Sequence, residues 1–428
     1  MSSSQGSSSS LVHRSPVYYG WIVLGISTLG MAATLPGQTA GVSLFIDAFI
    51  EDLGLSRSAV SWFYTVATVL GSLSLPLVGR LVDRFGPRRM AVAIIACFAV
   101  SCIGMNWVSG WIGVFVGFVC LRGFGQGALS LVNNHAVNLW FERRRGLAVG
   151  ILGLGMAGAT ALFPPLIDEG IQSYGWQTTY LLMGGLLAIT MLPLGALLYR
   201  DAPEDYGLSS DPEPATDSTT EPTVSTEDTA VHGLDPGTAY RTWTFWLFTV
   251  AGVCTAGLGT GLLFHHFSIL EEVGVGRDLA AQVFIPLGVV TAVFNVGTGW
   301  LVDRYPPRFL LGCQLALFGA MMGLLPAANT TIEVWVYGGV FGITQGMQQA
   351  LLGSAYAYYF GRLHHGTIRG LANTVFIGGT AIGPAVLALG PAFMDGFAPI
   401  LWLTTPLPLV LALTAILAWR REWDAEVL

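Results

Sequence analysis

The 428-residue chain contains no lysine, and charged residues make up only 11% of it. Its five cysteines fall inside apolar runs without the spacing of a metal site. A glycine-rich phosphate loop and a spaced cluster of His, Cys or Asp are also missing. These absences exclude an integral enzyme or a respiratory subunit built around metal, haem or quinone. We therefore expect no enzymatic activity, no metal, no cofactor and no nucleic-acid partner.

Hydrophobic residues supply 53% of the chain, and 55 residues are glycine. No soluble domain of this length covers so much apolar surface, so the composition predicts an all-α polytopic membrane protein. Twelve apolar stretches have the length that a membrane-spanning helix requires. They lie at about 17–42, 59–79, 90–108, 111–140, 145–166 and 177–199, and at about 244–270, 281–302, 308–326, 332–359, 368–391 and 398–419.

The two sets of six stretches are separated by a segment rich in Pro, Asp, Glu, Ser and Thr, which cannot bury enough apolar area to fold. The Ser-rich beginning of the chain lacks the pattern of a cleavable signal, so the first apolar stretch is expected to direct insertion. The predicted parts are a disordered N-terminal tail (1–16), a six-helix bundle (17–200), an acidic cytoplasmic linker (201–240), a second six-helix bundle (241–420) and a C-terminal tail (421–428).

A charged turn is written twice in the chain. The sequence GRLVDRFGPRR (79–89) returns as GWLVDRYPPR (299–308), and Asp303 follows Asp83 by 220 residues (303 − 83 = 220). The same offset matches EDLGLSR (51–57) with EEVGVGR (271–277). Apolar periodicity alone does not reproduce matched Asp, Arg and Gly positions over such a distance. The chain is therefore a duplication, and its halves are expected to face each other.

The arginines predict the orientation. Most of them fall in the two tails, in the central linker and in the connectors that follow the second, fourth, eighth and tenth stretches. Only Arg57 and Arg277, which are repeat equivalents, fall on the other side. Basic connectors remain in the cytoplasm, so we expect both termini there and a multi-pass protein of the cell membrane.

The doubled Gly-x-Leu-x-Asp-Arg motif resembles the signature loop of the major facilitator superfamily, and the resemblance covers nearly the whole chain. It implies twelve transmembrane helices in two pseudo-symmetric six-helix bundles. The motif carboxylate is expected to accept hydrogen bonds from a helix N-terminus or an arginine and to latch helices together; a merely solvated turn is the alternative. Pro306 departs from the usual glycine in the second copy. The expected latch and motif residues are Gly79, Asp83, Arg84, Gly86, Arg88, Asp303, Arg304, Arg308, Arg143, Arg144 and Arg145.

Three other stretches are similar to monocarboxylate transporters and their oxalate/formate-exchanging relatives. They are WFERRRGLAVG (140–150), YYGW (18–21) and PEDYGL (203–208). That resemblance implies a small organic anion as substrate. The chain departs from the group in one respect, because those carriers have a basic residue inside the eighth stretch, whereas 281–302 has none. The eleventh stretch also lacks an intramembrane lysine, so other residues have to bind the anion.

Arg122 lies near the middle of the stretch 111–140, where an arginine costs roughly 2.5–3.5 kcal/mol on insertion scales. Gln126 has a repeat equivalent in Gln345, whereas Arg122 corresponds to Phe341. The duplicated scaffold therefore explains the glutamines and not the arginine. Arg122 is predicted either to contact an anionic substrate or to hydrogen-bond to helix carbonyls.

His265 and His266 are asymmetric too, since the first half has Phe45 and Ile46 at these positions. A histidine changes charge near physiological pH and is a candidate carrier of a coupling proton; a histidine with no function at the membrane interface is the alternative. Adjacent helical residues point about 100° apart, so only one of the pair is expected to face a cavity. The other candidate substrate-binding residues are Gln38, Asn134, Gln345 and Tyr356, with His135 near them in the polar set.

The sequence thus predicts a secondary active transporter that moves a small organic anion, most readily a monocarboxylate, by alternating access. Protons are the candidate coupling ion in a symport, and a monomer in the lipid bilayer is expected. The alternative is efflux or antiport of a different small molecule, either an amphipathic compound or a dicarboxylate in exchange.

Overall fold

The computed structural model describes residue 12 and residues 15–141, 144–210, 234–302, 304–360 and 365–427. These residues form helices, and no strand occurs among them. The N-terminal half contains α2 (Tyr19–Ala33), α3 (Thr39–Ser43), α4 (Ile46–Leu53), α5 (Arg57–Leu73), α6 (Leu75–Phe85), α7 (Pro87–Gly104), α8 (Gly110–Cys120), α9 (Ser130–Trp140), α10 (Arg145–Leu186) and α11 (Leu192–Leu198). The C-terminal half contains α12 (Pro236–Ala239), α13 (Trp243–Phe264), α14 (His266–Glu272), α15 (Arg277–Gln282), α16 (Phe284–Val302), α17 (Pro307–Leu324), α18 (Thr331–Phe360), α19 (His365–Leu387), α20 (Leu389–Phe393), α21 (Phe397–Thr404) and α22 (Pro406–Val427).

Nine stretches of the described chain are long and apolar enough to cross a membrane. One of them, Leu147–Leu198, holds two helices, because the chain turns at Gly175 (φ 78°, ψ 161°), a conformation that suits glycine. The helices α18 and α19, of 30 and 23 residues, complete the set. The expected twelve-helix, two-bundle architecture is therefore confirmed.

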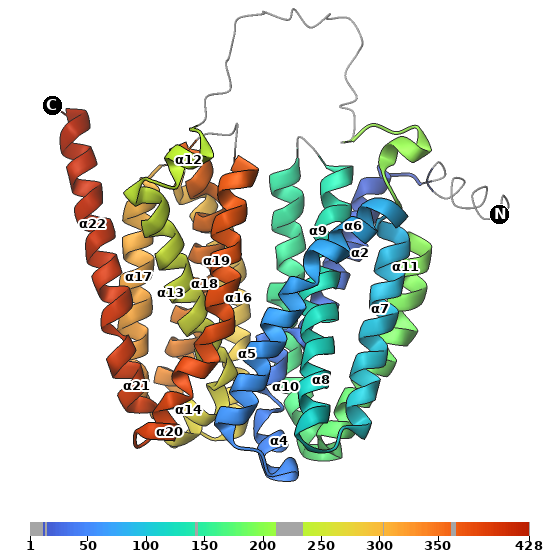
Figure 1. The fold of residues 1–428 in the computed structure, drawn as a ribbon, viewed down its shortest axis with the longest axis horizontal. Helices are drawn as coiled ribbons and strands as arrows, with labels where there is room; N and C mark the ends of the chain where they lie inside the picture. Colours follow the sequence, from blue (N-terminus) through green and yellow to red (C-terminus); the bar gives the residue numbers. More distant parts are fainter. Residues whose placement is uncertain are drawn as a thin grey trace, which may run out of the picture.

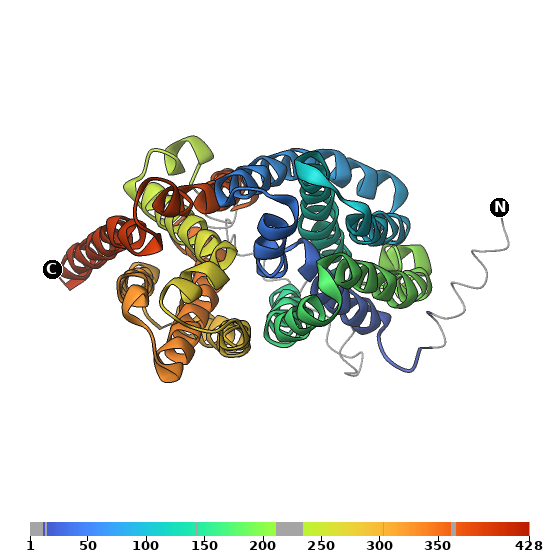
Figure 2. The same ribbon diagram turned by 90° about the horizontal axis from the view of Figure 1, so that it is seen from below.

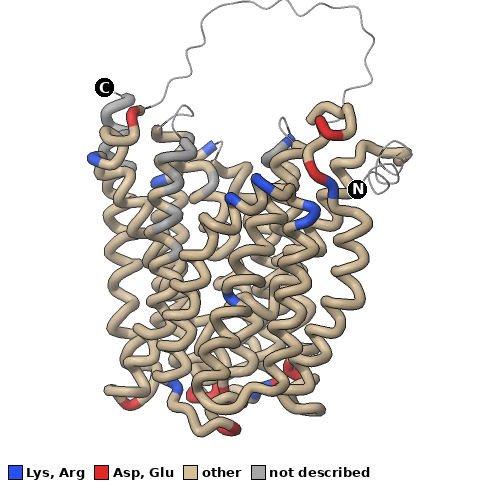
Figure 3. The backbone as a smooth tube through the Cα atoms, turned by 45° about the vertical axis from the view of Figure 1, so that its right-hand side comes forward, with Lys and Arg blue, Asp and Glu red and all other residues tan. Residues whose placement is uncertain are grey.

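The two halves stand side by side as separate bundles (Figures 1 and 2). The start of α2 and the end of α22 lie at one face of the molecule, which we call the terminal face; the opposite face is the far face (Figure 1). Charged residues gather at these two faces, and the apolar helices run between them (Figure 3). The predicted linker falls mostly on residues 211–233, which lie outside the described residues, as does most of the N-terminal tail.

The first spanning helix is interrupted in its middle. Pro36 cannot continue the hydrogen-bond ladder of α2, and after a short turn over Leu35–Gly37 the backbone is extended at Gln38 (φ −84°, ψ 159°). A helix then resumes as α3. Leu121–Leu129, which joins α8 to α9, is a π-helical segment, and such segments often mark functional sites. A Cβ on Gly37 would lie 3.1 Å from the Cα of Gly125, so the two irregular segments pack backbone to backbone.

Small residues bring the halves together at the level of these interruptions. The helix α10 packs against α16, where a Cβ on Gly288 would lie 2.7 Å from the Cβ of Ala161. The helix α5 packs against α19, and α3 packs against α13. Glycine and alanine at such contacts let helix backbones approach closely in a membrane. The contact between the halves is therefore made in part by small residues, and Gly288 also lines the cavity described below.

Candidate functional site

A cavity of ≈ 410 Å³ lies between the two halves. That volume falls in the range of small-molecule sites, which is about 300–1,000 Å³. The polar side chains of its lining are Gln38, Thr39, Thr160, Thr291, Asn295, Gln345 and Gln349. The larger apolar side chains are Met31, Leu154, Met156, Leu263 and Leu287. A ligand in the cavity can therefore contact both apolar side chains and amide or hydroxyl groups.

The polar lining contains no carboxylate and no charged residue. Its amides are partly occupied: Asn295 donates to Gln349 at 3.1 Å, and Gln38 donates to the Thr34 hydroxyl at 3.0 Å. Gln349 at the rim is exposed. Amides and hydroxyls both donate and accept hydrogen bonds. The lining therefore accommodates a neutral or an anionic ligand, and it offers no counter-charge to a cation.

Arg122 is not part of this lining and is only 2% exposed, but it bonds to Gly37, the residue before Gln38 of the lining. Its Nη1 donates to the carbonyl oxygen of Gly37 at 3.0 Å, and its Nε donates to the Thr68 hydroxyl at 3.0 Å. The guanidinium lies 4.5 Å from the centre of the Tyr64 ring. The break after Pro36 frees backbone carbonyls that no helix bond satisfies, and Arg122 satisfies one of them.

The charge of Arg122 is not neutralised by any carboxylate among the residues that the structure describes. Its Nη2 is buried without a hydrogen-bond partner. An unpaired cation inside the membrane is costly, and such residues usually serve a substrate or ion path. Of the two sequence-based alternatives, hydrogen bonding to a helix carbonyl is observed. The unpaired Nη2 is the atom that remains available for the other alternative, contact with a substrate.

Two aromatic rings meet across the interface between the halves, next to residues of the cavity lining. Tyr64 from the N-terminal half and Phe264 from the C-terminal half have ring centres 4.5 Å apart. The Tyr64 hydroxyl shares a 2.6 Å hydrogen bond with Thr39, which lines the cavity, and Leu263 lines it next to Phe264. The pair is thus one of the contacts that hold the two halves together beside the cavity.

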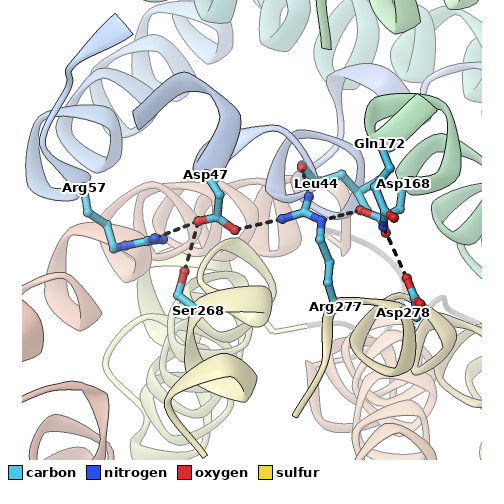
Figure 4. A network of polar contacts seen from close by, with 8 residues as sticks. All are labelled: Leu44, Asp47, Arg57, Asp168, Gln172, Ser268, Arg277 and Asp278. Atoms are coloured by element: carbon cyan, nitrogen blue, oxygen red, sulfur yellow. Dashed lines mark hydrogen bonds and ion pairs between the residues drawn. The ribbon is translucent and has the colours of Figure 1, made fainter. Parts of the chain in front are cut away.

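A charged network joins the two halves at the far face (Figure 4). Arg277 of the C-terminal half donates from Nε to Asp168 at 2.7 Å, from Nη1 to Asp47 at 3.1 Å and from Nη2 to the carbonyl oxygen of Leu44 at 2.7 Å. All three acceptors belong to the N-terminal half. We call this network the far gate; its other members are Arg57 and Ser268, which bond to Asp47, and Gln172, which bridges Asp168 and Asp278.

His265 and His266 take part in the closure of the far face and do not line the cavity. Both are buried. The Nε2 of His265 lies 2.9 Å from the carbonyl oxygen of Pro384 and 3.5 Å from the Ser61 hydroxyl across the interface. The Nε2 of His266 lies 2.9 Å from the carbonyl oxygen of Ala280. A carbonyl only accepts, so each Nε2 carries a proton and donates. The expectation that one of the pair faces the cavity does not fit this arrangement, in which each ring supports the end of a helix.

The other sequence-predicted binding residues divide between the cavity and the packed interior. Gln38 and Gln345 line the cavity. Asn134 donates to the carbonyl oxygen of Ser130 one turn earlier in its own helix, and the buried Tyr356 shares a 3.1 Å hydrogen bond with Thr249. Neither Asn134 nor Tyr356 is among the residues that line the cavity.

Sequence reasoning missed five polar lining residues and both acids of the far gate. Thr291 and Asn295, like Gln345 and Gln349, are four residues apart inside apolar helices, a spacing that puts both members of a pair on one face. That spacing could have identified these four residues as one polar helix face. Thr39 and Thr160 have no comparable pattern in the sequence. For the far gate, the matched pair Arg57 and Arg277 was noticed, but their partners are distant in sequence: Asp168 is 109 residues from Arg277.

At the terminal face, the first copy of the charged motif acts within its own half. Gly86 has a positive φ of 81°, and the following helix α7 begins with the backbone N–H of Arg88 donating to Asp201 at 3.1 Å. The Arg88 side chain donates to the carbonyl oxygen of Ala196 at 2.9 Å. A carboxylate thus caps this helix N-terminus, but it belongs to Asp201, at the end of the bundle, and not to the motif; the expected role of Asp83 stays a prediction.

The second copy is also held inside its own half. Arg304 lies over the Trp300 ring at 3.5 Å, and Arg308 contacts the Tyr359 ring at 5.0 Å and the Thr244 hydroxyl. In the first copy, Arg84 lies over Phe85 at 5.3 Å. Of the remaining motif residues, Gly79 is inside α6, and Arg144 precedes α10. Asp303 and Arg143, and the side chains of Asp83 and Arg145, lie outside what the structure describes.

Twelve helices in two matched bundles, with a cavity between them closed at one face, define a secondary transporter. The chain belongs to the Major Facilitator Superfamily, whose sequence profile matches residues 20–384. It is therefore a membrane transporter and not an enzyme.

Several curated proteins of this superfamily are similar to the chain. It is 23% identical to monocarboxylate transporter 13 of Rattus norvegicus over 335 residues, 77% of this chain and 72% of that one. It is 26% identical to the probable nitrate/nitrite transporter NarK2 of Mycobacterium tuberculosis over 295 residues, 67% of this chain and 68% of the relative. It is 25% identical to the gallate transporter of Pseudomonas putida over 430 residues, 94% and 92% of the two chains.

Among solved structures, a bacterial homolog of the human lysosomal transporter Spinster, in an inward-facing and occupied conformation, has the same fold. The TM-score is 0.67 at 16% identity, and the match covers 94% of this chain and 96% of the other. The three curated relatives above are named for monocarboxylates, for nitrate and nitrite, and for gallate.

Proposed function

We propose that this transporter carries a small organic anion, and more narrowly a monocarboxylate with an apolar body, by alternating access through the central cavity. The observation that carries the proposal is the buried guanidinium of Arg122, which has no carboxylate partner among the described residues and keeps one Nη2 unpaired. A charge-assisted contact to a carboxylate is strongest where water is excluded.

Arg122 is linked to the cavity lining through the backbone that it contacts. Arg122 bonds to Gly37, and the next two residues, Gln38 and Thr39, line the cavity. The lining itself holds no acid that would repel an anion. An anion that enters between Gln38 and the glutamines of α18 meets amide donors first and the field of Arg122 behind them.

The apolar lining favours a substrate with a hydrocarbon or aromatic body. A cavity of ≈ 410 Å³ bordered by Met31, Leu154 and Met156 exceeds what a small inorganic anion needs. This agrees better with the relatives named for monocarboxylates and gallate than with the one named for nitrate and nitrite. The carboxylate is expected to bind near Arg122 and the body against the methionines and leucines.

We assign the terminal face to the cytoplasm. Arg80, Arg84, Arg88, Arg89, Arg144, Arg200, Arg241, Arg304 and Arg308 belong to the connectors and helix ends of that face. Arg57 and Arg277 belong to the far gate. Arginines concentrate on the cytoplasmic side of membrane proteins. The structure then represents a carrier that is closed to the outside at the far gate.

The test is counterflow in proteoliposomes that contain purified protein. The vesicles are loaded with one unlabelled anion at a time, lactate, benzoate, gallate or nitrate, and uptake of the same labelled anion from outside is measured. Uptake of one or more of the three carboxylates, with nitrate much weaker, supports the proposal. Uptake of none of them, or a strong preference for nitrate or for an uncharged amphipathic compound, contradicts it. Counterflow needs no imposed ion gradient, so an imposed pH gradient in a second series tests proton symport separately.

A further inference from the structure

The repeat gives the far gate an asymmetry that bears on the substrate. Arg57 and Arg277 are equivalent positions (277 − 57 = 220), and Arg57 pairs with Asp47 of its own half at 2.7 Å. The position equivalent to Asp47 in the C-terminal half is Phe267 (267 − 47 = 220). Arg277 lies over the Phe267 ring at 4.7 Å and takes its carboxylates from the other half.

This asymmetry decides what happens to the charges when the far face opens. In the closed gate, the positive charges of Arg57 and Arg277 balance the negative charges of Asp47 and Asp168. Separation of the halves leaves Arg57 with Asp47. It leaves Arg277 with no ion-pair partner among the described residues of its own half, and it leaves the 3%-exposed side chain of Asp168 with Gln172 alone. Opening therefore produces one unpaired guanidinium on the outer side of the cavity.

The surroundings of Arg277 suit a carboxylate with an apolar body. In the closed state its three nitrogens bind two carboxylates and a carbonyl oxygen, so the guanidinium is already oriented for oxygen acceptors. The Phe267 ring lies against its face. A far-face hollow of ≈ 350 Å³ reaches it, and Asp47, Glu51 and Glu271 also line that hollow. An anion approaching past these acids needs a specific cation to bind it.

We propose that Arg277 is the far-side capture residue for the substrate anion. Its guanidinium binds Asp47 and Asp168 while the far face is closed, and it binds the substrate carboxylate when that face opens. The gate carboxylates and the substrate thus compete for one arginine, and this competition couples opening to an anion on the far side. The inference rests on the proposed function, because it needs a carboxylate substrate.

The experiment measures KM separately from the two sides, in intact cells and in inverted membrane vesicles, with the carboxylate found by counterflow. Arg277→Gln should raise the far-side KM about tenfold or more, with the terminal-side KM within about twofold of wild type. Arg277→Lys should recover part of the far-side affinity, because it keeps the charge and loses the fork.

Phe267→Asp is the sharper variant, since it gives Arg277 the own-half carboxylate that the repeat provides to Arg57. It should raise the far-side KM although Arg277 remains, whereas the matched control Phe267→Asn should leave it within about twofold. A spin-label pair at Glu51 and Glu271, exposed repeat equivalents in the two halves, checks in a cysteine-free background that each variant is folded and opens.

A purely mechanical role for Arg277 predicts a wider distance distribution at that pair with the far-side KM unchanged, and this result would overturn the capture role. An equal rise of KM from both sides would overturn it as well. If the wild-type protein carries no carboxylate at all, the proposed function fails with it. Carboxylate transport by wild type together with a normal far-side KM in Arg277→Gln refutes the capture role only.

Discussion

The arginines at the centre and at the far face, Arg122 and Arg277, are both partly or fully buried, yet their partners differ. Arg277 is neutralised by Asp47 and Asp168 of the opposite half. Arg122 bonds to a backbone carbonyl and a hydroxyl of its own half, and no carboxylate in the described part of the chain neutralises it. The contacts of Arg277 must break when the halves separate, whereas those of Arg122 persist. The comparison separates an arginine whose ion pairs depend on the contact between the halves from one whose contacts lie within a single half.

Arg122→Gln should have the largest effect, because it removes a buried charge that no carboxylate in the described chain neutralises. We expect transport of the carboxylate to fall by about two orders of magnitude, as for the loss of a buried charge-assisted contact. Arg122→Lys should retain weakened transport. Binding to purified protein and the amount of protein in the membrane are the measurements.

The matched control for that variant is Arg241→Gln, which changes an exposed arginine in the turn before α13 that belongs to neither motif copy and does not line the cavity. Its transport should remain near wild type. Unchanged substrate affinity in Arg122→Gln would show that Arg122 is purely structural, and the anion assignment would lose its main support.

Asp168→Asn should have the next largest effect, and it acts on the gate. Removal of one partner of a buried ion pair costs about 3–5 kcal/mol when the remaining charge stays buried, and less here because Arg277 keeps Asp47 and is 30% exposed. We expect a clear shift of the population toward the state that is open at the far face. The distance between spin labels at positions 51 and 271 measures this shift.

Asp278→Asn is the control for the gate variant, since Asp278 only accepts a 3.3 Å hydrogen bond from Gln172. It should leave the distance distribution nearly unchanged. If both variants open the far face equally, the ion pair between Arg277 and Asp168 is not what closes it.

Asp201→Asn tests the terminal face, where charges act within one half. The loss of the carboxylate that caps α7 should cost about 1 kcal/mol of stability. The melting temperature of the purified protein should fall by a few degrees, and the distance between positions 51 and 271 should not change. A change in that distance would mean that the terminal-face motif also controls the far gate.

Tyr356→Phe should have the smallest effect. It removes the hydroxyl that bonds to Thr249 and leaves the buried ring in place. We expect transport within about twofold of wild type and a stability loss of about 1 kcal/mol or less. A strong loss of substrate affinity would return Tyr356 to the binding site that the sequence predicted for it.

The sequence predicted the fold well and the site only in part. Hydropathy and the 220-residue offset predicted twelve helices in two bundles, because membrane spans need continuous apolar runs of fixed length. Gln38 and Gln345 were found because they are polar inside such runs. Asn134, Tyr356 and the histidines are also polar inside such runs, but none of them lines the cavity. Asn134 and Tyr356 bond within their own half, and each histidine contacts a carbonyl oxygen near a helix end. A one-dimensional pattern does not tell these directions apart.

The sequence by itself determined the class of the protein, its duplication and the unusual position of a charged residue, Arg122, inside an apolar stretch. Each of these follows from composition and spacing. The tertiary structure alone decided which charges meet. Asp47, Asp168 and Arg277 are far apart in the chain, and they form one network because the two halves close on each other at the far face. The same packing left Arg122 without a carboxylate partner in the described chain. Pairing of charges depends on distances in space, and those are fixed only when helices from both halves are packed.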